Sequence, residues 1–217
     1  MQNKKSFIPE NAKSPKVRLQ WYFRNIRLQK QRKRLTNANF SIISNNCLGA
    51  LLTHDYLQPF LSPTVNLFIN PSDFVKFISN LEDNLKEDVI EITSNKNYPV
   101  GSINGCRIDF MHYTTFKEAR QQWIKRSKRV NLRNLLLLLV ERDGCTYDNL
   151  KRFDSLPYPN KVAIVHKPYP LLKSTIYIPG FEQMNEVGTI TDWKNLFGKR
   201  KYDIVDWVKI LNNLRKE

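Results

Sequence analysis

The chain has 217 residues, 41% of them hydrophobic and 12% aromatic, which excludes a disordered chain and allows a sizeable core. Its net charge is +15, and its three cysteines lack the regular spacing of a disulfide framework or a zinc site. No apolar leader is visible, and the run Leu135–Val140 is far too short to span a bilayer. We therefore expect a protein of the reducing cytoplasm.

The positive charge is concentrated near the N-terminus. Residues 1–36 hold eleven Lys or Arg and a single acid, Glu10, whereas the remaining chain is only mildly basic. We predict a basic, helical arm over residues 1–36, followed by an α/β domain over residues 37–217. Within the arm a helix fits Lys16–Leu35, which contains neither Gly nor Pro. Its apolar residues fall into two groups on a helical wheel, Val17, Trp21 and Leu28 on one side and Leu19, Phe23 and Ile26 nearer the other. One group would pack on the protein and the other would meet a partner.

From residue 37 onward, strand-like and helix-like patterns alternate. Strands are predicted over 40–44, 64–69, 88–93, 134–141, 161–166 and 175–178. Helices are predicted over 47–57, 71–82, 115–129, 146–154 and 201–214. The uniformly apolar Leu135–Val140 is typical of a central parallel strand covered on both faces, and Asn104-Gly105 predicts a β-hairpin within residues 98–110. This order favours a three-layer α/β/α fold with a mainly parallel sheet and an added hairpin.

Polar segments follow three of the predicted strands, namely Ser44–Cys47, Glu141–Cys145 and His166–Pro170, and a fourth, around His112, follows the hairpin. The carboxyl ends of parallel strands share one edge of a sheet, and that edge is where open α/β sheets bind ligands. We therefore expect one candidate site there, formed by Asn45, Asn46, Cys47, His112, Arg142, Asp143, His166 and Lys167.

Each of these residue types has a chemical role and an ordinary structural one. Cys47, in the first turn of a helix, could be a dipole-activated thiolate or a small buried filler. Asp143 could hold a divalent ion or a ribose, or it could simply belong to the turn that Gly144 permits. His166 could be a base or a satisfied core histidine. No metal-ligand set is evident apart from the option of a divalent ion at Asp143.

Blocks of sequence along the body also resemble a known family. They are SNNCLG at 44–49, SPTVNLFI at 62–69, DFVKF at 73–77, YPVG at 98–101, HYTTFKEA at 112–119, ERDGCTYDNL at 141–150, FDSLPYPNKV at 153–162, KPYP at 167–170, YIPGF at 177–181 and GKRKYD at 198–203. Together they resemble the bacterial domain-of-unknown-function family nineteen-nineteen, over about residues 37–214. The resemblance implies an α/β fold and a role in capsular or exopolysaccharide biosynthesis, and it supplies no catalytic residues.

Three functions fit these observations. A glycosyltransferase-like enzyme would use Arg142, Lys167 and the turn N–H groups near Asn46 to hold the phosphates of a nucleotide sugar, and Asp143 as the base. Its other substrate would be a polysaccharide precursor. A thiol acyltransferase or hydrolase would instead use Cys47 as nucleophile, His166 as base and Asp143 as the residue that orients His166. The third function is a non-catalytic assembly protein that binds a glycan or an anion.

The basic arm has its own alternatives. Interleaved aromatic and basic residues occur in nucleic-acid-binding proteins, but no known nucleic-acid-binding motif is present, so we do not expect that partner. We expect residues 1–36 to contact an anionic membrane peripherally at its inner face, because each basic residue near such a surface adds roughly 1 kcal/mol. The sequence does not indicate an oligomeric state.

Overall fold

The structure, a computed structural model, describes residues 14–215. Within these residues two compact units are present, one formed by residues 14–37 with 189–213 and the other by residues 38–188 with 214–215. The boundary expected after residue 36 lies one residue from the end of the first segment. Residues 189–213, which we predicted to be part of a 37–217 domain, group instead with the N-terminal segment. Residues 1–13 of the predicted arm lie outside the described residues.

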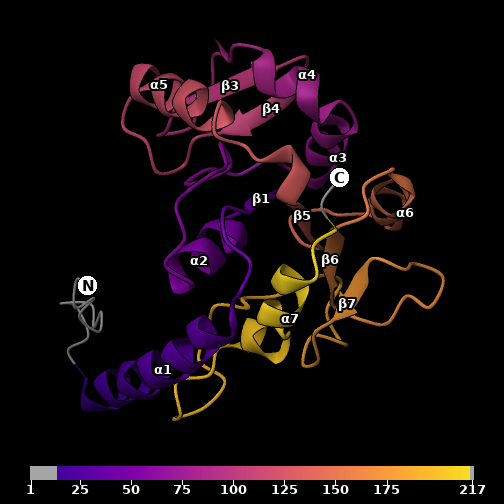
Figure 1. The fold of residues 1–217 in the computed structure, drawn as a ribbon. Coiled ribbons are helices and arrows are strands. Elements are labelled where there is room, and N and C mark those ends of the chain that lie inside the picture. Colours follow the sequence, from indigo (N-terminus) through magenta and orange to yellow (C-terminus); the bar gives the residue numbers. More distant parts are fainter. Residues whose placement is uncertain (1–13, 216–217) are drawn as a thin grey trace. The chain divides into compact units, whose positions relative to one another are not determined.

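The larger unit contains a four-stranded parallel sheet (Figure 1). In spatial order its strands are β1 (Ser41–Ser44), β5 (Leu135–Val140), β6 (Lys161–Val165) and β7 (Thr175–Tyr177). β5 lies between β1 and β6, and all of its residues are buried, as expected for an apolar strand covered on both faces. The predicted α/β class with a mainly parallel sheet is confirmed.

Helices cover both faces of this sheet. They are α2 (Leu48–Asp55), α3 (Pro71–Ser79) and α6 (Tyr147–Ser155). α2 packs on the face that carries Ile42, and a Cβ on Gly49 would lie 3.0 Å from Ile42 Cγ2. α3 and α6 contribute apolar side chains to the core cluster that contains Ile43, and successive residues of a strand point to opposite faces. Three layers therefore result.

A separate antiparallel sheet contains the predicted hairpin. Its strands, in spatial order, are β2 (Ile90–Glu91), β3 (Val100–Ile103) and β4 (Cys106–Asp109). Asn104 and Gly105 have φ angles of 47° and 71°, and such positive values at both central residues are what a type I′ hairpin turn requires. α5 (Phe116–Ser127) covers this sheet (Figure 1), and its Trp123 meets Phe110 edge-on with the ring centres 6.3 Å apart.

Two predicted strands are wrong in whole or in part. Residues 64–69 form no strand, and Phe68 makes only an isolated bridge to Asp109. Asn66 has a φ of 64°, a left-handed conformation that interrupts an extended chain. The strand predicted over 88–93 is reduced to the two residues of β2.

The helices predicted over residues 71–82 and 201–214 are both interrupted. The first ends at Asn80, which leaves the helical conformation with φ −127° and ψ 48°, and the chain resumes as α4 (Leu81–Lys86). The second divides into the 3-10 helix η2 (Lys201–Ile204) and α7 (Trp207–Asn212), because Asp206 is non-helical and caps α7. A further 3-10 turn, η1 (Leu132–Asn134), leads into β5.

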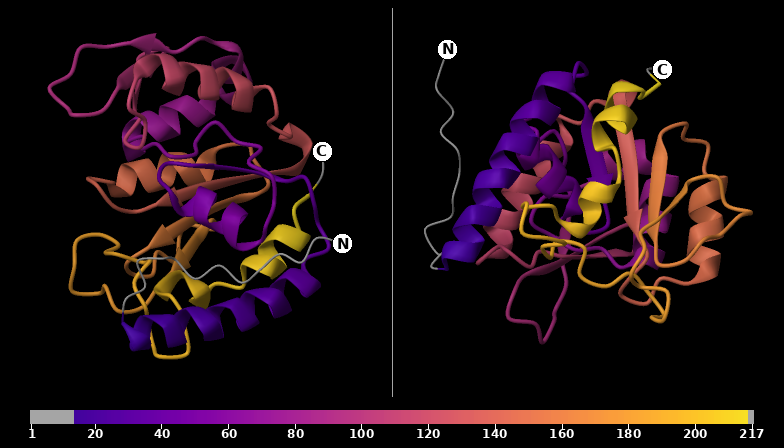
Figure 2. Two further views of the ribbon diagram at one scale, coloured as in Figure 1. Left: turned by 90° about the vertical axis from the view of Figure 1, so that its left-hand side faces the viewer. Right: turned by 90° about the horizontal axis from the view of Figure 1, so that it is seen from below.

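The smaller unit pairs α1 (Pro15–Arg34) with residues 189–213 (Figure 2). Arg24 on α1 is only 1% exposed, and it donates to Asp203 Oδ2 at 2.8 Å and to the Tyr202 hydroxyl at 2.6 Å. The Arg200 guanidinium lies 5.3 Å from the Trp21 ring centre and 5.0 Å from that of Trp193. Because the buried Arg24 side chain requires a carboxylate beside it, its pairing with Asp203 joins α1 to residues 189–213.

α1 has 20 residues, a length that could cross a bilayer, but it carries eight Lys or Arg. Within residues 14–215 no helix is both long enough and apolar enough for a membrane span.

Candidate functional site at the carboxyl edge of the parallel sheet

The three polar segments leave the sheet at one edge. β1 pairs with β5, and β5 with β6, in parallel, so that Ser44, Val140 and Val165 end neighbouring strands on the same side. β1 and β6 are separated by two inter-strand spacings, about 10 Å. The side chains that follow these strands can therefore serve one ligand.

Asn45 connects two of these strands. Its side-chain Oδ1 accepts from Val140 N at 2.9 Å, and its Nδ2 donates to Val140 O at 3.3 Å. Its backbone N–H continues the ladder to Leu138 O, and the residue is fully buried. Asn45 thus extends the pairing of β1 with β5. We had expected Asn45 to contribute to the ligand site, but its amide is bonded to the backbone of Val140 instead.

Asn46 closes the turn into α2. Its Oδ1 accepts from Leu48 N at 3.0 Å, and Ser44 Oγ accepts from Gly49 N at 3.2 Å. Side chains therefore already occupy these first N–H groups of the helix. The expectation that N–H groups near Asn46 would hold a phosphate is wrong for these two donors.

Cys47 pairs with a different histidine from the one expected. Its Sγ lies 3.9 Å from Nε2 of His112, which follows the second sheet. Burial raises the pKa of the Cys47 thiol, which disfavours the thiolate. Because His166 and Asp143 have other partners, the predicted arrangement of Cys47, His166 and Asp143 as a triad is not formed.

Glu141, His166 and Tyr169 form a buried hydrogen-bonded network. Glu141 Oε2 accepts from the His166 backbone N–H at 2.9 Å and lies 2.7 Å from His166 Nδ1. Glu141 Oε1 accepts from the Tyr169 hydroxyl at 2.6 Å. The side chains of Glu141 and His166 are only 3% and 5% exposed, so this carboxylate exchanges water for three protein donors.

This network determines which nitrogen of His166 can act. A carboxylate only accepts, so Nδ1 carries the proton that it shares with Glu141. Burial and the hydrogen bond to Glu141 raise the pKa of Tyr169, so its hydroxyl remains a donor. Among residues 14–215 no hydrogen-bond partner of Nε2 is found, and this nitrogen is the one that can take a proton from a ligand. A histidine oriented in this way has the geometry that general-base chemistry requires.

Cationic and anionic side chains surround this network at the surface. Arg142 Nε donates to Asp143 Oδ2 at 3.0 Å, and both side chains are about one-third exposed. Asp143 and Gly144 have φ angles of 58° and 81°, which form a tight turn just beyond β5. Lys167 is exposed, and its Nζ lies 5.7 Å from the centre of the Tyr169 ring. Asp143 is therefore paired with a cation, while Lys167 faces solvent.

Sequence reasoning missed Glu141 and Tyr169. The available signals were a glutamate placed directly after six apolar residues and a tyrosine within the Lys167–Pro170 exit segment. A third neighbour is Cys145, where burial and the nearby Glu141 and Glu186 raise the pKa of the thiol to about 12 and so disfavour the thiolate.

Acidic, histidine and cysteine side chains are the groups that commonly hold a metal ion in proteins. Within residues 14–215 no group of three or more His, Cys, Asp or Glu side chains is placed to hold a metal ion. The carboxylate considered for a divalent ion, Asp143, bonds to Arg142 instead of facing another acid.

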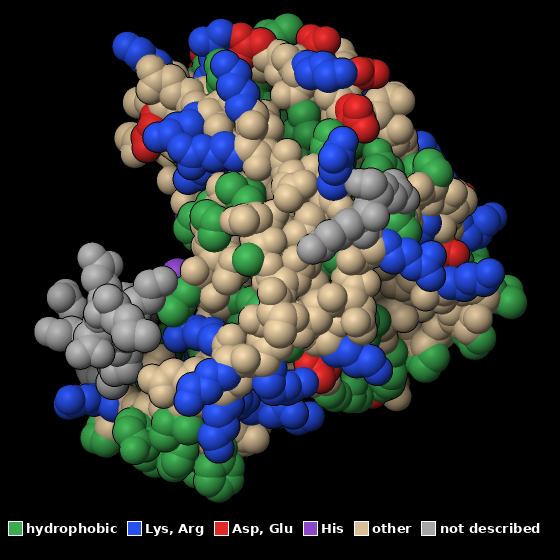
Figure 3. Space-filling view, viewed as in Figure 1, with side chains coloured by type: hydrophobic (Ala, Val, Ile, Leu, Met, Phe, Trp, Pro, Cys, Tyr) green, Lys and Arg blue, Asp and Glu red, His purple; other side chains and the backbone are tan. Residues whose placement is uncertain are grey.

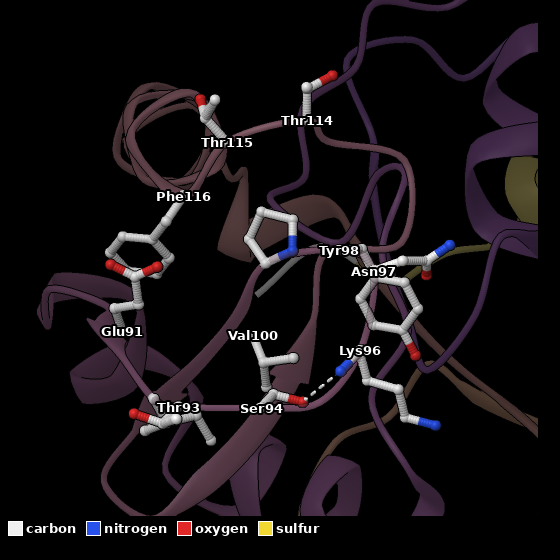
Figure 4. Close-up of a pocket in the computed structure, with 12 residues that line it drawn as sticks. Glu91, Thr93, Ser94, Lys96, Asn97, Tyr98, Val100, Thr114, Thr115 and Phe116 are labelled. Atoms are coloured by element: carbon white, nitrogen blue, oxygen red, sulfur yellow. Dashed lines mark hydrogen bonds between the residues drawn. The ribbon is translucent and has the colours of Figure 1, made fainter.

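A surface cavity of about 810 Å³ lies on the second sheet (Figure 4). Lys96, Asn97 and Tyr98 stand on one side of it, and Glu91 and Phe116 stand on the other (Figure 4). Thr93, Ser94, Thr114 and Thr115 add hydroxyl groups, and Ile92, Pro99 and Val100 add apolar surface. Such a mixture of hydroxyl, amide, carboxylate and ring surface suits a polar ligand of sugar size.

One residue that lines the cavity is close in sequence to the edge of the parallel sheet. Thr114 lines the cavity and is two residues from His112, the partner of Cys47, so that their Cα atoms are within about 7.6 Å.

The fold and this edge together define an α/β protein with an oriented histidine at the carboxyl end of a parallel sheet. The chain belongs to the family described as Domain of unknown function (DUF1919), whose profile matches residues 19–212. It is 41% identical over 204 residues to a Haemophilus influenzae protein named "Uncharacterized protein", covering 94% of this chain and 98% of that one. The match includes most of α1, so the family extends into the segment that we had expected to lie outside it.

Proposed function

We propose that this protein is a glycosyltransferase-like enzyme that acts on a precursor of bacterial capsular polysaccharide or exopolysaccharide. The observation that carries the proposal is the buried Glu141–His166–Tyr169 network at the carboxyl edge of the sheet. The fixed tautomer leaves Nε2 of His166 as a proton acceptor, which favours an enzyme over a protein that only binds a glycan. The polysaccharide context comes from the family resemblance in the sequence.

The proposed chemistry transfers a sugar from a nucleotide sugar to an acceptor hydroxyl. His166 Nε2 takes the proton of the acceptor hydroxyl as its oxygen attacks the anomeric carbon of the donor. The bond from that carbon to the phosphate oxygen breaks, and the nucleoside diphosphate leaves with the bonding electrons. Arg142 and Lys167 lie on the same segments as the network and offset the charge of the leaving phosphates. Glu141 is a positioning residue in this scheme.

The cavity of Figure 4 lies on the second sheet, away from the Glu141 network, and offers a place for a remote part of a carbohydrate acceptor. Tyr98 and Phe116 offer ring surface, and the surrounding hydroxyl, amide and carboxylate groups can exchange hydrogen bonds with sugar hydroxyls. We place the activity in the cytoplasm, because the three described cysteines are free thiols, as expected in a reducing compartment.

Binding of the donor tests this proposal first. A panel of nucleoside diphosphate sugars at about 100 times a typical dissociation constant should stabilise the protein by about 2.7 kcal/mol, seen as a raised melting temperature. Replacing Arg142 and Lys167 by Gln should remove the shift, whereas replacing Lys151 and Arg152 of α6 by Gln should preserve it. A panel in which no donor changes the melting temperature contradicts the proposal.

A second candidate function is favoured by the contact between Cys47 and His112. With Sγ 3.9 Å from Nε2, His112 could take the thiol proton while Cys47 attacks an acyl ester; the bond to the ester's alkoxy oxygen breaks, and that alcohol leaves with the proton from His112. A polysaccharide hydroxyl then attacks the thioester, takes the acyl group and returns the thiol. In that case Cys47→Ser should abolish transfer while His166→Asn retains it. The raised pKa of Cys47 argues against this function.

A further inference from the structure

The smaller unit carries an exposed apolar surface formed by two segments. The first is one side of α1, and the second is the loop Trp193–Arg200. Four large apolar side chains on them are substantially exposed, Leu19 (47%), Tyr22 (57%), Leu196 (52%) and Phe197 (66%), and we call this set the apolar tip. Exposed apolar side chains that gather in one place mark an interaction surface more often than isolated ones do.

The loop presents its part of the apolar tip in a fixed conformation. Lys194 N donates to Lys199 O at 2.6 Å, and Trp193 and Arg200 form a β-bridge below it. Gly198 has a φ of 62° and packs on the backbone of α1, so closely that a Cβ there would lie 1.9 Å from Gln20 O. Only glycine allows this contact, and the contact holds Leu196 and Phe197 at the end of the loop.

Phe197 is tied to α1 through its ring and its backbone. Its ring meets Phe23 edge-on at 5.6 Å, and its carbonyl oxygen accepts from Arg27 Nη2 at 2.6 Å. The side chain nevertheless remains two-thirds exposed. An apolar side chain that is fixed in position but exposed to solvent is available to contact another apolar surface.

Cations surround the apolar tip. Lys194 and Lys199 flank Leu196 and Phe197 in the loop, and Lys16 lies one helical turn before Leu19. α1 contains no acidic residue at all. Figure 3 shows hydrophobic side chains gathered at the lower left of the view, over the end of α1, with Lys and Arg side chains beside them.

We propose that the apolar tip docks on an anionic phospholipid membrane, with Leu196 and Phe197 inserted among the headgroups and the surrounding lysines bound to lipid phosphates. An apolar side chain at the membrane interface gains from leaving water, and each neighbouring cation adds attraction to an anionic leaflet. The charge argues against a second copy of this chain as the occupant, because pairing two such surfaces would bring like charges together. The expectation of a membrane-contacting arm over residues 1–36 thus gains a partner segment from residues 193–200.

Vesicle sedimentation of the full chain tests the proposal. With vesicles of phosphatidylcholine and phosphatidylglycerol we expect binding that falls as salt is raised, and with phosphatidylcholine alone we expect at least tenfold weaker binding. The Leu196→Ser, Phe197→Ser double variant should bind anionic vesicles at least about tenfold more weakly. Replacing Lys194 and Lys199 by Gln should also weaken binding about tenfold.

Matched variants keep the result interpretable. Ile90→Ser removes an equally exposed apolar side chain from β2 of the larger unit and should bind as the unchanged protein does. Leu196→Ser alone, which leaves the Phe197–Phe23 contact in place, should still weaken binding severalfold if the double variant proves unstable. Equal binding to neutral and anionic vesicles, or unchanged binding of both Leu196 variants, overturns the proposal. It is also overturned if the apolar tip mediates self-association without vesicles, measured by analytical ultracentrifugation.

Discussion

A single buried carboxylate organises the candidate site. Glu141 lies directly after the apolar strand β5, and burial there would be costly without compensation. Its oxygens are satisfied by the backbone N–H and Nδ1 of His166 and by the hydroxyl of Tyr169. The cost of burying the charge is thus offset by hydrogen bonds that at the same time orient His166.

Glu141→Gln should therefore destabilise the protein substantially. The amide has the same shape but adds two donors where three donors already converge, so one hydrogen bond must be lost or reversed. We expect the free energy of unfolding to fall by about 2–4 kcal/mol, measured by urea denaturation. Glu87→Gln, at an exposed position on the surface, is the control and should change it by less than about 0.5 kcal/mol. A near-neutral Glu141→Gln would show that the network contributes little.

Tyr169 should give the protein a distinctive alkaline pH dependence. Its pKa is raised in the folded state by burial and by the bond to Glu141, from an ordinary value of 10.0. Above that ordinary value the unfolded chain releases this proton while the folded protein still binds it. The contribution of Tyr169 to the free energy of unfolding is therefore fully present below about pH 10 and falls as the pH rises further. Tyr169→Phe should be less stable near neutral pH and lose less of its stability between pH 9 and 11. Parallel stability curves for the two proteins would contradict the prediction.

For single residues, the sequence was enough to predict which segments carry the polar side chains of the site. It was not enough to predict which of these side chains bond to one another. His166 was predicted as a candidate base, but its partner Glu141 was not predicted. Whether Glu141 or Asp143 bonds to His166 depends on which of the two side chains is buried against β6. The positive φ of Asp143 turns that carboxylate outward toward Arg142. Such local backbone geometry is not visible in a pattern of residue types.

At the scale of elements, the joining of β1 to β5 positions the site. Asn45 continues the ladder beyond Ser44 with its side chain, so the two strands remain paired up to the residue before Glu141. The backbone of Asn45 also accepts from Ile69 N, which ties the segment before α3 to the same point.

Asn45→Ala should cost more than Asn46→Ala. The first change removes two buried hydrogen bonds and leaves the N–H and C=O of Val140 without their side-chain partner, and we expect a loss of about 2–4 kcal/mol. The second removes one bond at a helix start, for about 1 kcal/mol. Chemical denaturation of both variants measures the difference, and equal losses would contradict the role assigned to Asn45.

Elements with strong local signals could be predicted, and those defined by tertiary contacts could not. β5 and the hairpin were predicted because uniform apolarity and Asn104-Gly105 each favour one structure. Residues 64–69 have strand-like composition but only one bridge to Asp109, since the chain there is buried by packing and not by sheet pairing. Periodicity alone does not distinguish these two kinds of burial.

At the scale of the whole molecule, the chain forms two units that the charge distribution only partly predicted. The excess of basic residues near the N-terminus gives no sign that residues 189–213 belong to the same unit as the first segment. That grouping depends on specific pairs, in particular Arg24 with Asp203, which are far apart in the sequence. Without an observed pairing, a basic helix is indistinguishable from a free arm.

The pair of Arg24 and Asp203 should hold the smaller unit together. Their side chains are 1% and 5% exposed, and Asp203 Oδ2 also lies 3.2 Å from Arg27 Nη1, so Arg24→Ala leaves Asp203 buried with one remaining cation and should destabilise the unit by about 2–3 kcal/mol. The double variant with Asp203→Ala should cost less than the sum of the two single changes. Arg34→Ala, which breaks an exposed pair with Asp206, is the control and should cost at most about 1 kcal/mol. Hydrogen exchange within residues 189–213 reports the effect, and unchanged protection in Arg24→Ala would contradict it.

The most direct test of the account is the release of nucleoside diphosphate from nucleotide sugars in the presence of a polysaccharide precursor. We predict release with at least one donor, slowed by about 10²–10⁴-fold in His166→Asn and unaffected in His54→Asn, both folded by circular dichroism. Release at an undiminished rate in folded His166→Asn would contradict the claim that a glutamate-oriented histidine removes the acceptor proton.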